Sequence, residues 1–310
     1  MQDKIKYLRI ILTEECNLNC YYCHKEGCDK NNKILSKENI IKLINCFYKL
    51  GINKFKFMGG EPTLRLDLID ILYEIKDLKD IDSSIITNGL FSIDTIEKYF
   101  EAGLKRVNVS VHGWSDEKKL KLIGMSQEKR EKFLLNLKYL LKKNKLNKIN
   151  YVFLKNDNRE EIINLINWIN EKKIVLDILN VLYSPKNENL KREYCTFEEI
   201  YNFLKKNYKI YKECNWENLS SIPSKRIFLE EGGIINLKIN TLNQIKPFNS
   251  CKNCRVIEYC KEGIKAIRLT TDGYLKPCLF RDDNKLNLIE HINKNEDELS
   301  KMILNYINNL

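Results

Sequence analysis

The chain has 310 residues, of which 43% are hydrophobic and 31% are charged, a composition typical of folded globular proteins. Lysine and arginine outnumber aspartate and glutamate by 53 to 42, and the net charge of +11 is spread along the chain without large blocks of one sign. No apolar run is long enough to span a membrane, and the first ten residues include charges that do not fit a secretory signal. We therefore expect a cytoplasmic protein with no membrane association. Without a zinc-finger or helix-turn-helix pattern, nucleic acid is not an expected partner.

Short β-rich runs alternate with helical patterns over the first 181 residues. Strands are expected at Tyr7–Thr13, Lys54–Met58, Ser83–Thr87, Arg106–Val111, Lys148–Leu154 and Ile174–Val181. Helices are expected between them, at Lys37–Leu50, Leu66–Leu78, Ile93–Glu101, Gln127–Lys143 and Arg159–Asn170. The strand centres recur every ~33 residues, a step that suits βα units with right-handed crossovers. This pattern predicts an α/β fold, either a parallel sheet or an incomplete barrel, with its site at the carboxyl ends of the strands.

The pattern weakens after residue 183 and becomes distinct again near the C-terminus. Between Ser184 and Pro247 the only expected element is a helix at Phe197–Asn207. Farther along, Asp272–Gly273 separates two strand-like runs and predicts a β-hairpin. The runs are Ala266–Thr271 and Tyr274–Leu279, and a helix is expected near Leu288–Asn305. We expect three parts: a barrel over residues 1–183, a connecting region over 184–246, and a C-terminal extension over 247–310.

Cysteine is the unusual residue of this composition. There are 11 cysteines, an odd number, in a chain that is large enough to bury a core without disulfides. Cys16, Cys20 and Cys23 form a C-x3-C-x2-C pattern in the loop after the first strand. Three thiolates at this spacing can hold a [4Fe–4S] cluster with one iron open to a small chelating ligand. The alternative is zinc, with His24 or Cys28 as the fourth ligand.

Two segments carry a resemblance to a known family. The cysteine loop LRIILTEECNLNCYYCHKEG and the later FMGGEPTLR resemble the cluster loop and the GGEP element of the radical S-adenosylmethionine (radical SAM) superfamily. The resemblance covers about residues 6–181. It implies a partial (βα)6 TIM-like barrel and an enzyme whose cluster reduces SAM to a 5'-deoxyadenosyl radical, which abstracts a substrate hydrogen. An external electron donor such as flavodoxin or ferredoxin would supply the electron.

The same resemblance implies which residues contact SAM. Tyr22 supplies an aromatic face between two of the cluster cysteines. Gly59 and Gly60 would allow the backbone to approach a ligand closely, because they lack a Cβ. The full set of expected contacts is Tyr22, Gly59, Gly60, Glu61, Pro62, Thr87, Asn88, Ser110 and Asn150, with the stretch from Asn150 to Asn158 in the same region.

A second cysteine set lies in the C-terminal extension. Cys251, Cys254, Cys260 and Cys278 are spaced C-x2-C-x5-C-x17-C around the expected hairpin, which suits a metal site. AIRLTTDGYLKPCLF resembles the cluster region of the molybdenum-cofactor GTP 3',8-cyclases, and more broadly the extensions of peptide-maturing radical SAM enzymes. The resemblance favours a second [4Fe–4S] cluster over zinc. Whether three or four cysteines bind it stays open.

Four basic residues match positions that line the nucleotide site of the cyclases: Arg9, Lys54, Lys56 and Arg268. Their side chains suit phosphate or a polar base edge. The alternative is that the lysines only mark a polar strand face. Three features depart from the cyclase pattern: Ala266 stands where an arginine is expected, His112 stands where an aspartate is expected, and the chain ends Tyr-Ile-Asn-Asn-Leu instead of in two glycines.

These observations predict a radical SAM enzyme that acts on a small anionic, nucleotide-like substrate, with a second iron–sulfur cluster near that substrate. The alternative is a maturase that modifies or crosslinks a ribosomal peptide. A rival from another class is a non-catalytic zinc- or iron–sulfur-binding interaction protein, for which GGEP would be coincidental. His112 and Cys28 are the only candidates for further chemistry, as an acid or base and as a thiol that quenches a substrate radical. The alternatives are that His112 is a structural histidine and that Cys28 is a bystander thiol.

Overall fold

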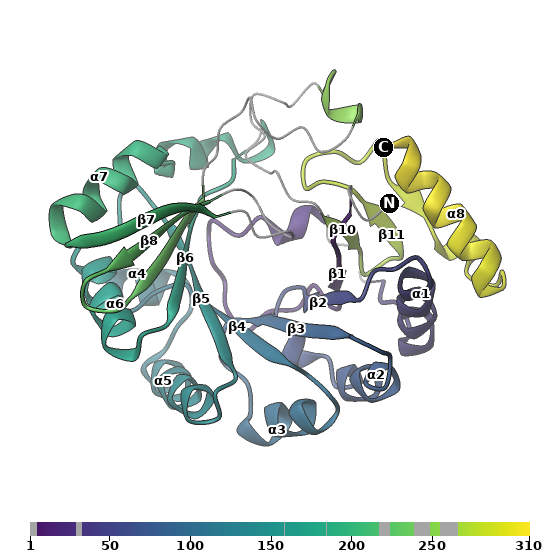
Figure 1. The fold of residues 1–310 in the computed structure, drawn as a ribbon, viewed down its shortest axis with the longest axis horizontal. Helices are drawn as coiled ribbons and strands as arrows, with labels where there is room; N and C mark the ends of the chain where they lie inside the picture. The colour runs from purple at the N-terminus through teal and green to yellow at the C-terminus, as the bar shows by residue number, and fades with distance from the viewer. Residues whose placement is uncertain are drawn as a thin grey trace.

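Twelve strands of the described residues form one sheet in the order β12-β11-β10-β1-β2-β3-β4-β5-β6-β9-β8-β7 (Figure 1). The computed structural model describes residues 5–28, 33–157, 159–183, 185–216, 224–238, 249–254 and 266–310. The strands are β1 (Tyr7–Ile11), β2 (Lys54–Met58), β3 (Asp82–Thr87), β4 (Arg106–Val111), β5 (Leu146–Phe153), β6 (Val175–Asn180), β7 (Ile210–Trp216), β8 (Ser224–Leu229), β9 (Ile234–Lys238), β10 (Ala266–Leu269), β11 (Tyr274–Lys276) and β12 (Leu286–Asn287).

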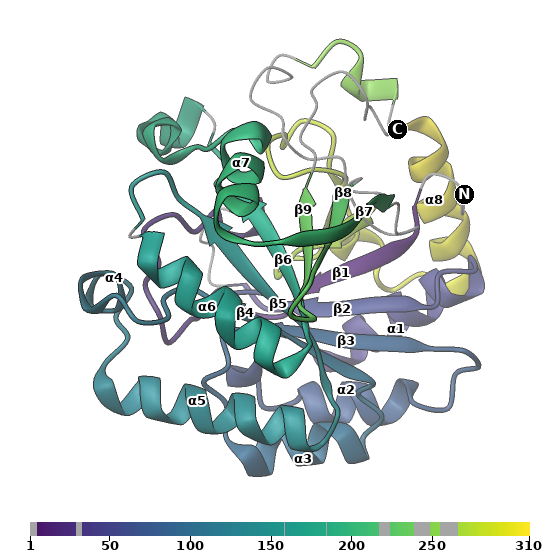
Figure 2. The same cartoon turned by 60° about the vertical axis from the view of Figure 1, so that its left-hand side comes forward.

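Strands β1 to β6 are parallel and each pairs with the next, so they form the wall of an open barrel. Helices cover its outer face (Figures 1 and 2). They are α1 (Lys37–Lys49), α2 (Leu68–Ile75), α3 (Ile93–Glu101), α4 (Glu117–Leu122), α5 (Gln127–Lys142) and α6 (Arg159–Lys172). The predicted partial (βα)6 TIM-like barrel is confirmed. Strands β2 and β4 and helix α3 have the expected bounds, whereas α4 was not expected.

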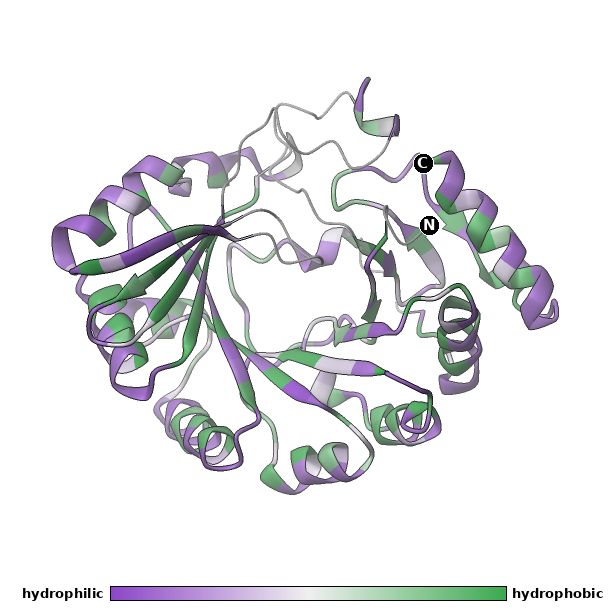
Figure 3. Cartoon of the chain, in the orientation of Figure 1, coloured by the Kyte–Doolittle hydropathy of each residue, from purple (hydrophilic) through white to green (hydrophobic). Residues whose placement is uncertain are grey.

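Local sequence explains the helix boundaries and the direction of the strand side chains. Ser36 caps α1 by accepting a hydrogen bond from the Asn39 N–H, and Gly51 follows the helix with φ of +85°. Alternate strand residues such as Leu8 and Phe55 belong to the hydrophobic core beneath the helices. Because strand side chains alternate in direction, the residues between them face the barrel interior. Figure 3 shows polar and apolar segments alternating along the strands.

The region after the barrel contains more structure than expected. Helix α7 (Phe197–Asn207) has the predicted bounds and begins with a capping box between Thr196 and Glu199. The expectation that the rest of this region lacks elements was wrong, because β9 pairs in parallel with β6 while β8 and β7 extend the sheet as antiparallel strands. Lys212 and Glu213 are exposed in β7 and break the alternation of polar and apolar residues that would predict a strand. Strands from all three predicted segments belong to one sheet, so the sheet does not mark the boundaries between them. The three-part division therefore stays a prediction.

The predicted hairpin is confirmed, and it lies beside the first strand of the barrel. Strands β10 and β11 are antiparallel, and β10 pairs in parallel with β1. The last helix, α8 (Glu296–Asn309), begins later than expected, after Asn295 caps it, and a short turn precedes it. It packs on α1, where Cys46 Sγ donates to the Glu296 carbonyl at 3.5 Å. In the part of the chain that the structure describes, no helix is both long and apolar enough to cross a bilayer.

Candidate active site at the carboxyl ends of the barrel strands

The loops that follow the parallel strands meet at one edge of the barrel. This edge carries the cysteine loop after β1, the Gly59–Gly60 turn after β2, Thr87–Asn88 at the end of β3 and Ser110 near the end of β4. The expected SAM-binding residues are therefore gathered at one rim, as in other (βα) barrels whose sites lie at this face.

Two of the three thiols in the cysteine loop accept hydrogen bonds from N–H donors. Cys23 Sγ accepts from the Lys25 N–H at 3.4 Å, and Cys16 Sγ accepts from Asn88 Nδ2 at 3.8 Å. Cys16 and Cys23 are exposed, whereas Cys20 is half-buried. Donors directed at sulfur stabilise thiolate, the form that binds iron, so this donor set suits an iron–sulfur cluster.

Loss of water around the sulfur atoms keeps these thiols protonated unless a cation is present. It raises the pKa of Cys20 to about 12, and it also raises the pKa values of Cys16 and Cys23, although other atoms of these two residues are exposed. Binding a positively charged centre would displace the protons. Within the described residues, no group of three or more His, Cys, Asp or Glu side chains is arranged to hold a single metal ion.

The GGEP turn is joined to the cysteine loop through backbone contacts. The Gly60 N–H donates to the Thr13 carbonyl at 2.7 Å, and the Glu61 N–H donates to the Glu15 carbonyl at 2.7 Å. A Cβ on Gly60 would lie 2.1 Å from the Glu15 carbonyl oxygen, and one on Gly59 would lie 2.4 Å from that of Thr13. The cysteine loop itself thus requires both glycines, a reason that the sequence did not reveal.

Substituting Gly60→Ala should displace the cysteine loop, because the new methyl group meets backbone that cannot rotate away. We expect a loss of about 1–3 kcal/mol in unfolding free energy and poor iron incorporation. Urea unfolding and iron content after anaerobic reconstitution measure the two effects. Gly124→Ala is the control, since its Cβ meets nothing closer than 3.9 Å and only its φ of +75° is strained. Equal behaviour of the two variants would contradict the steric explanation.

Glu61 joins the GGEP turn to the end of β3. Its buried carboxylate accepts from Thr63 Oγ1 and Thr87 Oγ1, both at 2.7 Å, and from the Asn88 N–H at 2.7 Å. Burial raises the pKa of Glu61, although these hydrogen bonds oppose the rise. Glu61 therefore has a structural reason to be present, and it places Asn88 beside the cysteine loop, where Asn88 Nδ2 also donates to Asn17 Oδ1 at 2.6 Å.

The next two strands supply the remaining expected SAM contacts. Ser110 on β4 and Asn150 on β5 stand opposite each other in the parallel register, and both are half-buried. Beyond β5, Asn156 Nδ2 donates to Glu193 Oε1 at 3.1 Å. Asn158 lies outside the described residues. The two strand residues are thus placed together on one side of the rim.

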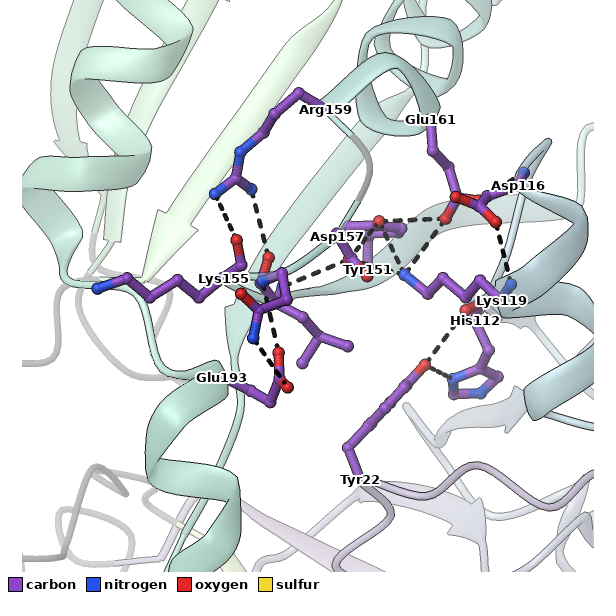
Figure 4. Close-up of polar contacts among 12 residues, drawn as sticks. Tyr22, His112, Asp116, Lys119, Tyr151, Lys155, Asp157, Arg159, Glu161 and Glu193 are labelled. Atoms are coloured by element: carbon purple, nitrogen blue, oxygen red, sulfur yellow. Dashed lines mark hydrogen bonds and ion pairs between the residues drawn. The ribbon is translucent and has the colours of Figure 1, made fainter.

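The side chains of Tyr22 and His112 are hydrogen-bonded to each other (Figure 4). The Tyr22 hydroxyl lies 3.0 Å from His112 Nδ1 and 3.3 Å from the His112 carbonyl oxygen, to which it can donate. Burial lowers the pKa of His112 to about 4, and the positive charge of Lys119 adds to the effect. The imidazole is therefore neutral near pH 7, and the structure gives it a bond to the cysteine loop that sequence reasoning did not anticipate.

A buried ion-pair network beside this pair was also missed. Lys119 Nζ lies 2.7 Å from Asp157 Oδ2 and 3.2 Å from Glu161 Oε1 (Figure 4). The Tyr151 hydroxyl donates to Asp157 Oδ2 at 2.8 Å. Asp116, the N-cap of α4, was the available signal, because a capping residue before Lys119 predicts a helix there. The partners of Lys119 come from β5, from the loop that follows it and from α6, which lie near Lys119 only in the folded chain.

The second cysteine set is described only in part. Cys251 and Cys254 lie in one turn, where the Cys254 N–H donates to the Cys251 carbonyl at 3.3 Å, and Cys278 follows β11. Cys260 lies within 255–265, outside the described residues. Cys28 lies near this hairpin, since a Cβ on its neighbour Gly27 would be 2.3 Å from the Leu279 carbonyl oxygen. Burial raises the pKa of the Cys28 thiol to about 12, which does not favour a reactive thiolate.

Three of the four predicted basic residues form a row across neighbouring strands. Arg268 on β10, Arg9 on β1 and Lys56 on β2 stand side by side in the parallel register. Lys54 lies at the start of β2, one pleat farther from the cysteine loop. The row lies in the wall of the barrel, below the rim.

Glu26, which the sequence did not single out, balances part of this charge. Its carboxylate lies 3.3 Å from both Arg9 Nη1 and Arg268 Nε. Burial alone would raise its pKa, but Arg9, His24 and Arg268 hold the pKa at about 2. Glu26 therefore ties the segment after Cys23 to β1 and β10, and it leaves Lys56 as the member of the row with no carboxylate partner among the described residues.

The low pKa of Glu26 makes stability depend on pH. Because the folded pKa of about 2 is below the ordinary 4.5, the ionised carboxylate contributes stability above pH 4.5, and this is lost as the pH falls toward 2. The contribution is about 3 kcal/mol at neutral pH. Glu26→Gln should therefore be less stable than the wild type near pH 7, and the difference should shrink to less than half by about pH 3. Urea unfolding of the metal-free proteins measures it, and a difference independent of pH would refute the ion pairs.

The chain is similar to known proteins over most of its length. A model of the radical SAM superfamily matches residues 10–169. A protein of Methanococcus aeolicus named "Probable GTP 3',8-cyclase" is 33% identical over 303 residues, a match that covers 95% of this chain and 92% of that protein. One of the same name from Methanocaldococcus jannaschii is 31% identical over 303 residues, covering 96% and 94%.

Solved structures share the fold. SuiB of Streptococcus suis superposes with a TM-score of 0.65 at 18% identity, over 96% of this chain but 65% of SuiB. The protein anSMEcpe, solved with bound AdoMet, superposes with a TM-score of 0.56 at 18% identity, over 94% of this chain and 81% of that one. The family model and the relatives of more than 30% identity agree with the three-cysteine loop and the GGEP turn, which are joined at one rim. Together they show that the chain is an enzyme of the radical SAM superfamily.

Proposed function

We propose that the enzyme abstracts hydrogen from an anionic, nucleotide-like small molecule bound in the barrel interior. When bound, a [4Fe–4S] cluster and SAM supply the 5'-deoxyadenosyl radical for this step. Cys16, Cys20 and Cys23 would hold the cluster, and an external donor such as flavodoxin or ferredoxin would reduce it. SAM would be held by Tyr22, the stretch from Gly59 to Pro62, Thr87, Asn88, Ser110 and Asn150. Our proposal for the substrate class depends mainly on one observation, the environment of Lys56.

Lys56 is a half-buried cation among other cations. Its ammonium group lies 4.2 Å from the ring centre of Tyr7, and among the described residues it forms no ion pair. Burial lowers the pKa of Lys56 well below its ordinary value, and the charges of Lys148, Arg9 and Arg106 add to this. An anion bound beside Lys56 would relieve both effects, so phosphate groups of a substrate fit this position.

The cyclase names of the relatives support a nucleotide, whereas particular residues argue against assuming GTP itself. The relatives are similar over nearly the whole chain. Ala266 and His112 nevertheless replace an arginine and an aspartate that the cyclase resemblance leads one to expect. We therefore propose the substrate class of a nucleotide and leave the base to the experiment.

We also propose a second [4Fe–4S] cluster at Cys251, Cys254, Cys260 and Cys278. These thiols would come from the turn before β10 and from the segment after β11. Cys278→Ala should lower the iron content while SAM cleavage continues without turnover of substrate. Iron and sulfide analysis, with 5'-deoxyadenosine measured by chromatography, tests this. Unchanged iron content in Cys278→Ala would contradict the second cluster.

The substrate class is tested by which compound stimulates SAM cleavage. The reconstituted enzyme is reduced with dithionite in the absence of oxygen and offered SAM with each of the four ribonucleoside triphosphates, or with short peptides. We expect one nucleotide to accelerate 5'-deoxyadenosine formation, and inorganic triphosphate to compete with it. Stimulation by peptides alone would contradict the proposal.

A peptide substrate is the second candidate, and the edge of the sheet favours it. Strand β7 is one of the two terminal strands of the described sheet, and most of its residues are exposed. Exposed edges can accept an added peptide strand. If the enzyme is a peptide maturase, the peptide arm of the same experiment should give the stimulation, and the nucleotides should give none.

A further inference from the structure

The turn between Cys20 and Cys23 contains an aromatic side chain with a polar anchor at its far end. Tyr22 lies between the two cysteines and is only 5% exposed. The Cys23 N–H donates to the Cys20 carbonyl at 3.0 Å, so the two thiols are carried by one tight turn. Tyr22 belongs to the same turn as both thiols, so a shift of this turn moves the ring and the thiols together.

An apolar cluster holds the body of the Tyr22 ring. Leu154, Val181 and Leu190 pack with it, and Cys20 packs against the same cluster. These residues follow β5, follow β6 and lie in the segment before α7, so four separate parts of the chain meet at this ring. Apolar packing is not directional, and it leaves the position of the hydroxyl undetermined.

His112 determines the position of the hydroxyl. Its Nδ1 lies 3.0 Å from the Tyr22 oxygen, and its ring comes from the end of β4, two residues after Ser110 (Figure 4). The hydroxyl can also donate to the His112 carbonyl at 3.3 Å. The Tyr22 side chain also forms a hydrogen bond with the Cys20 thiol. The cysteine turn is thereby connected to β4, which also carries an expected SAM contact.

We propose that His112 is a positioning residue for the first cluster, which acts through the Tyr22 hydroxyl to fix the Cys20–Cys23 turn against the end of β4. The inference rests on the proposed ligand role of these cysteines. His112 would keep the thiols of Cys20 and Cys23 at a fixed position relative to Ser110. Substitution of a residue that orients a metal ligand typically lowers activity 10- to 100-fold, although that residue does not touch the metal.

Four variants test this chain of contacts. His112→Ala removes the ring, Tyr22→Phe removes only the hydroxyl, and the double variant removes both. His112→Asn keeps a polar atom near the place of Nδ1 and should rescue. His291→Ala is the control, because His291 lies in the turn before α8, and no described contact joins it to the cysteine loop. The readouts are the iron content, the reduction potential of the SAM-responsive cluster, its EPR spectrum with and without SAM, and 5'-deoxyadenosine formation.

If the inference is correct, His112→Ala and Tyr22→Phe change the potential and the SAM-induced EPR signal in the same direction, and the double variant goes no further. Iron content stays at the wild-type level, 5'-deoxyadenosine formation falls about 10- to 100-fold, and His112→Asn recovers most of it. A Tyr22→Phe protein with the wild-type potential and spectrum would overturn the inference, even if His112→Ala failed to fold.

The outcomes distinguish this inference from the proposed function. A wild type that binds iron and gives a SAM-responsive spectrum, but is stimulated by no nucleotide, would overturn only the substrate proposal. If the Cys20→Ala variant had the same iron content and the same spectrum as the wild type, the ligand assignment would be overturned, and this inference with it.

Discussion

Replacing Cys20 by alanine should abolish cleavage of SAM and remove about four iron atoms per chain. Cys20 is the middle ligand of the expected cluster and is half-buried against the core. With two thiols left, the cluster has too few protein ligands to keep an iron open for SAM. Iron analysis and chromatography of 5'-deoxyadenosine after reduction with dithionite measure the loss.

A buried cysteine elsewhere provides the matched control. Cys46 lies in α1 and donates to the Glu296 carbonyl, far along the chain from the cysteine loop. Cys46→Ala should cost about 1 kcal/mol of stability through the lost contact and leave the iron content unchanged. Full iron content and normal cleavage in Cys20→Ala, or equal losses in both variants, would contradict the assignment of the first cluster.

The second large effect is expected at Lys56. Lys56→Met should weaken nucleotide binding about 10- to 100-fold, because it removes a charge-assisted contact worth about 1.5–3 kcal/mol. The protein itself should not lose stability, since burial disfavours the charge of Lys56 and methionine can still pack on Tyr7. Anaerobic equilibrium dialysis with the stimulating nucleotide measures the affinity, and thermal unfolding measures the stability.

Lys98→Met controls for the loss of one positive charge. Lys98 is an exposed residue of α3 paired with Asp94 at 2.7 Å, on the outer face of the barrel. Nucleotide affinity should be unaffected there apart from a small general effect of net charge. Wild-type affinity in Lys56→Met would place the anionic part of the substrate elsewhere.

Elements with strong local signals could be predicted from the sequence. Strands β2 and β4 alternate cleanly between core and interior, and α7 begins with a capping box, so their bounds follow from local rules. The edge strands could not be predicted in this way. Strand β7 is exposed on most of its residues and carries Lys212 and Glu213, which remove the hydrophobic alternation that identifies a strand.

In the candidate site, too, some features could be predicted from the sequence and others could not. The cysteines and the GGEP turn are close in sequence to the strands that place them, so their meeting at one rim could be predicted. The partners of Glu26, Lys119 and Tyr22 could not, because each contact joins residues distant in the chain: Glu26 meets Arg268, Lys119 meets Asp157, and Tyr22 meets His112. Such pairs depend on strand order and on helix placement, which spacing alone does not specify.

The most direct test of the proposed function is isotope transfer from the substrate. The reconstituted, reduced enzyme would be incubated with SAM and with each ribonucleoside triphosphate deuterated in its ribose, and the 5'-deoxyadenosine analysed by mass spectrometry. We expect one nucleotide to pass a single deuterium to the methyl group of 5'-deoxyadenosine. Unlabelled 5'-deoxyadenosine with every nucleotide, formed at the rate seen without substrate, would contradict a nucleotide as the source of the abstracted hydrogen.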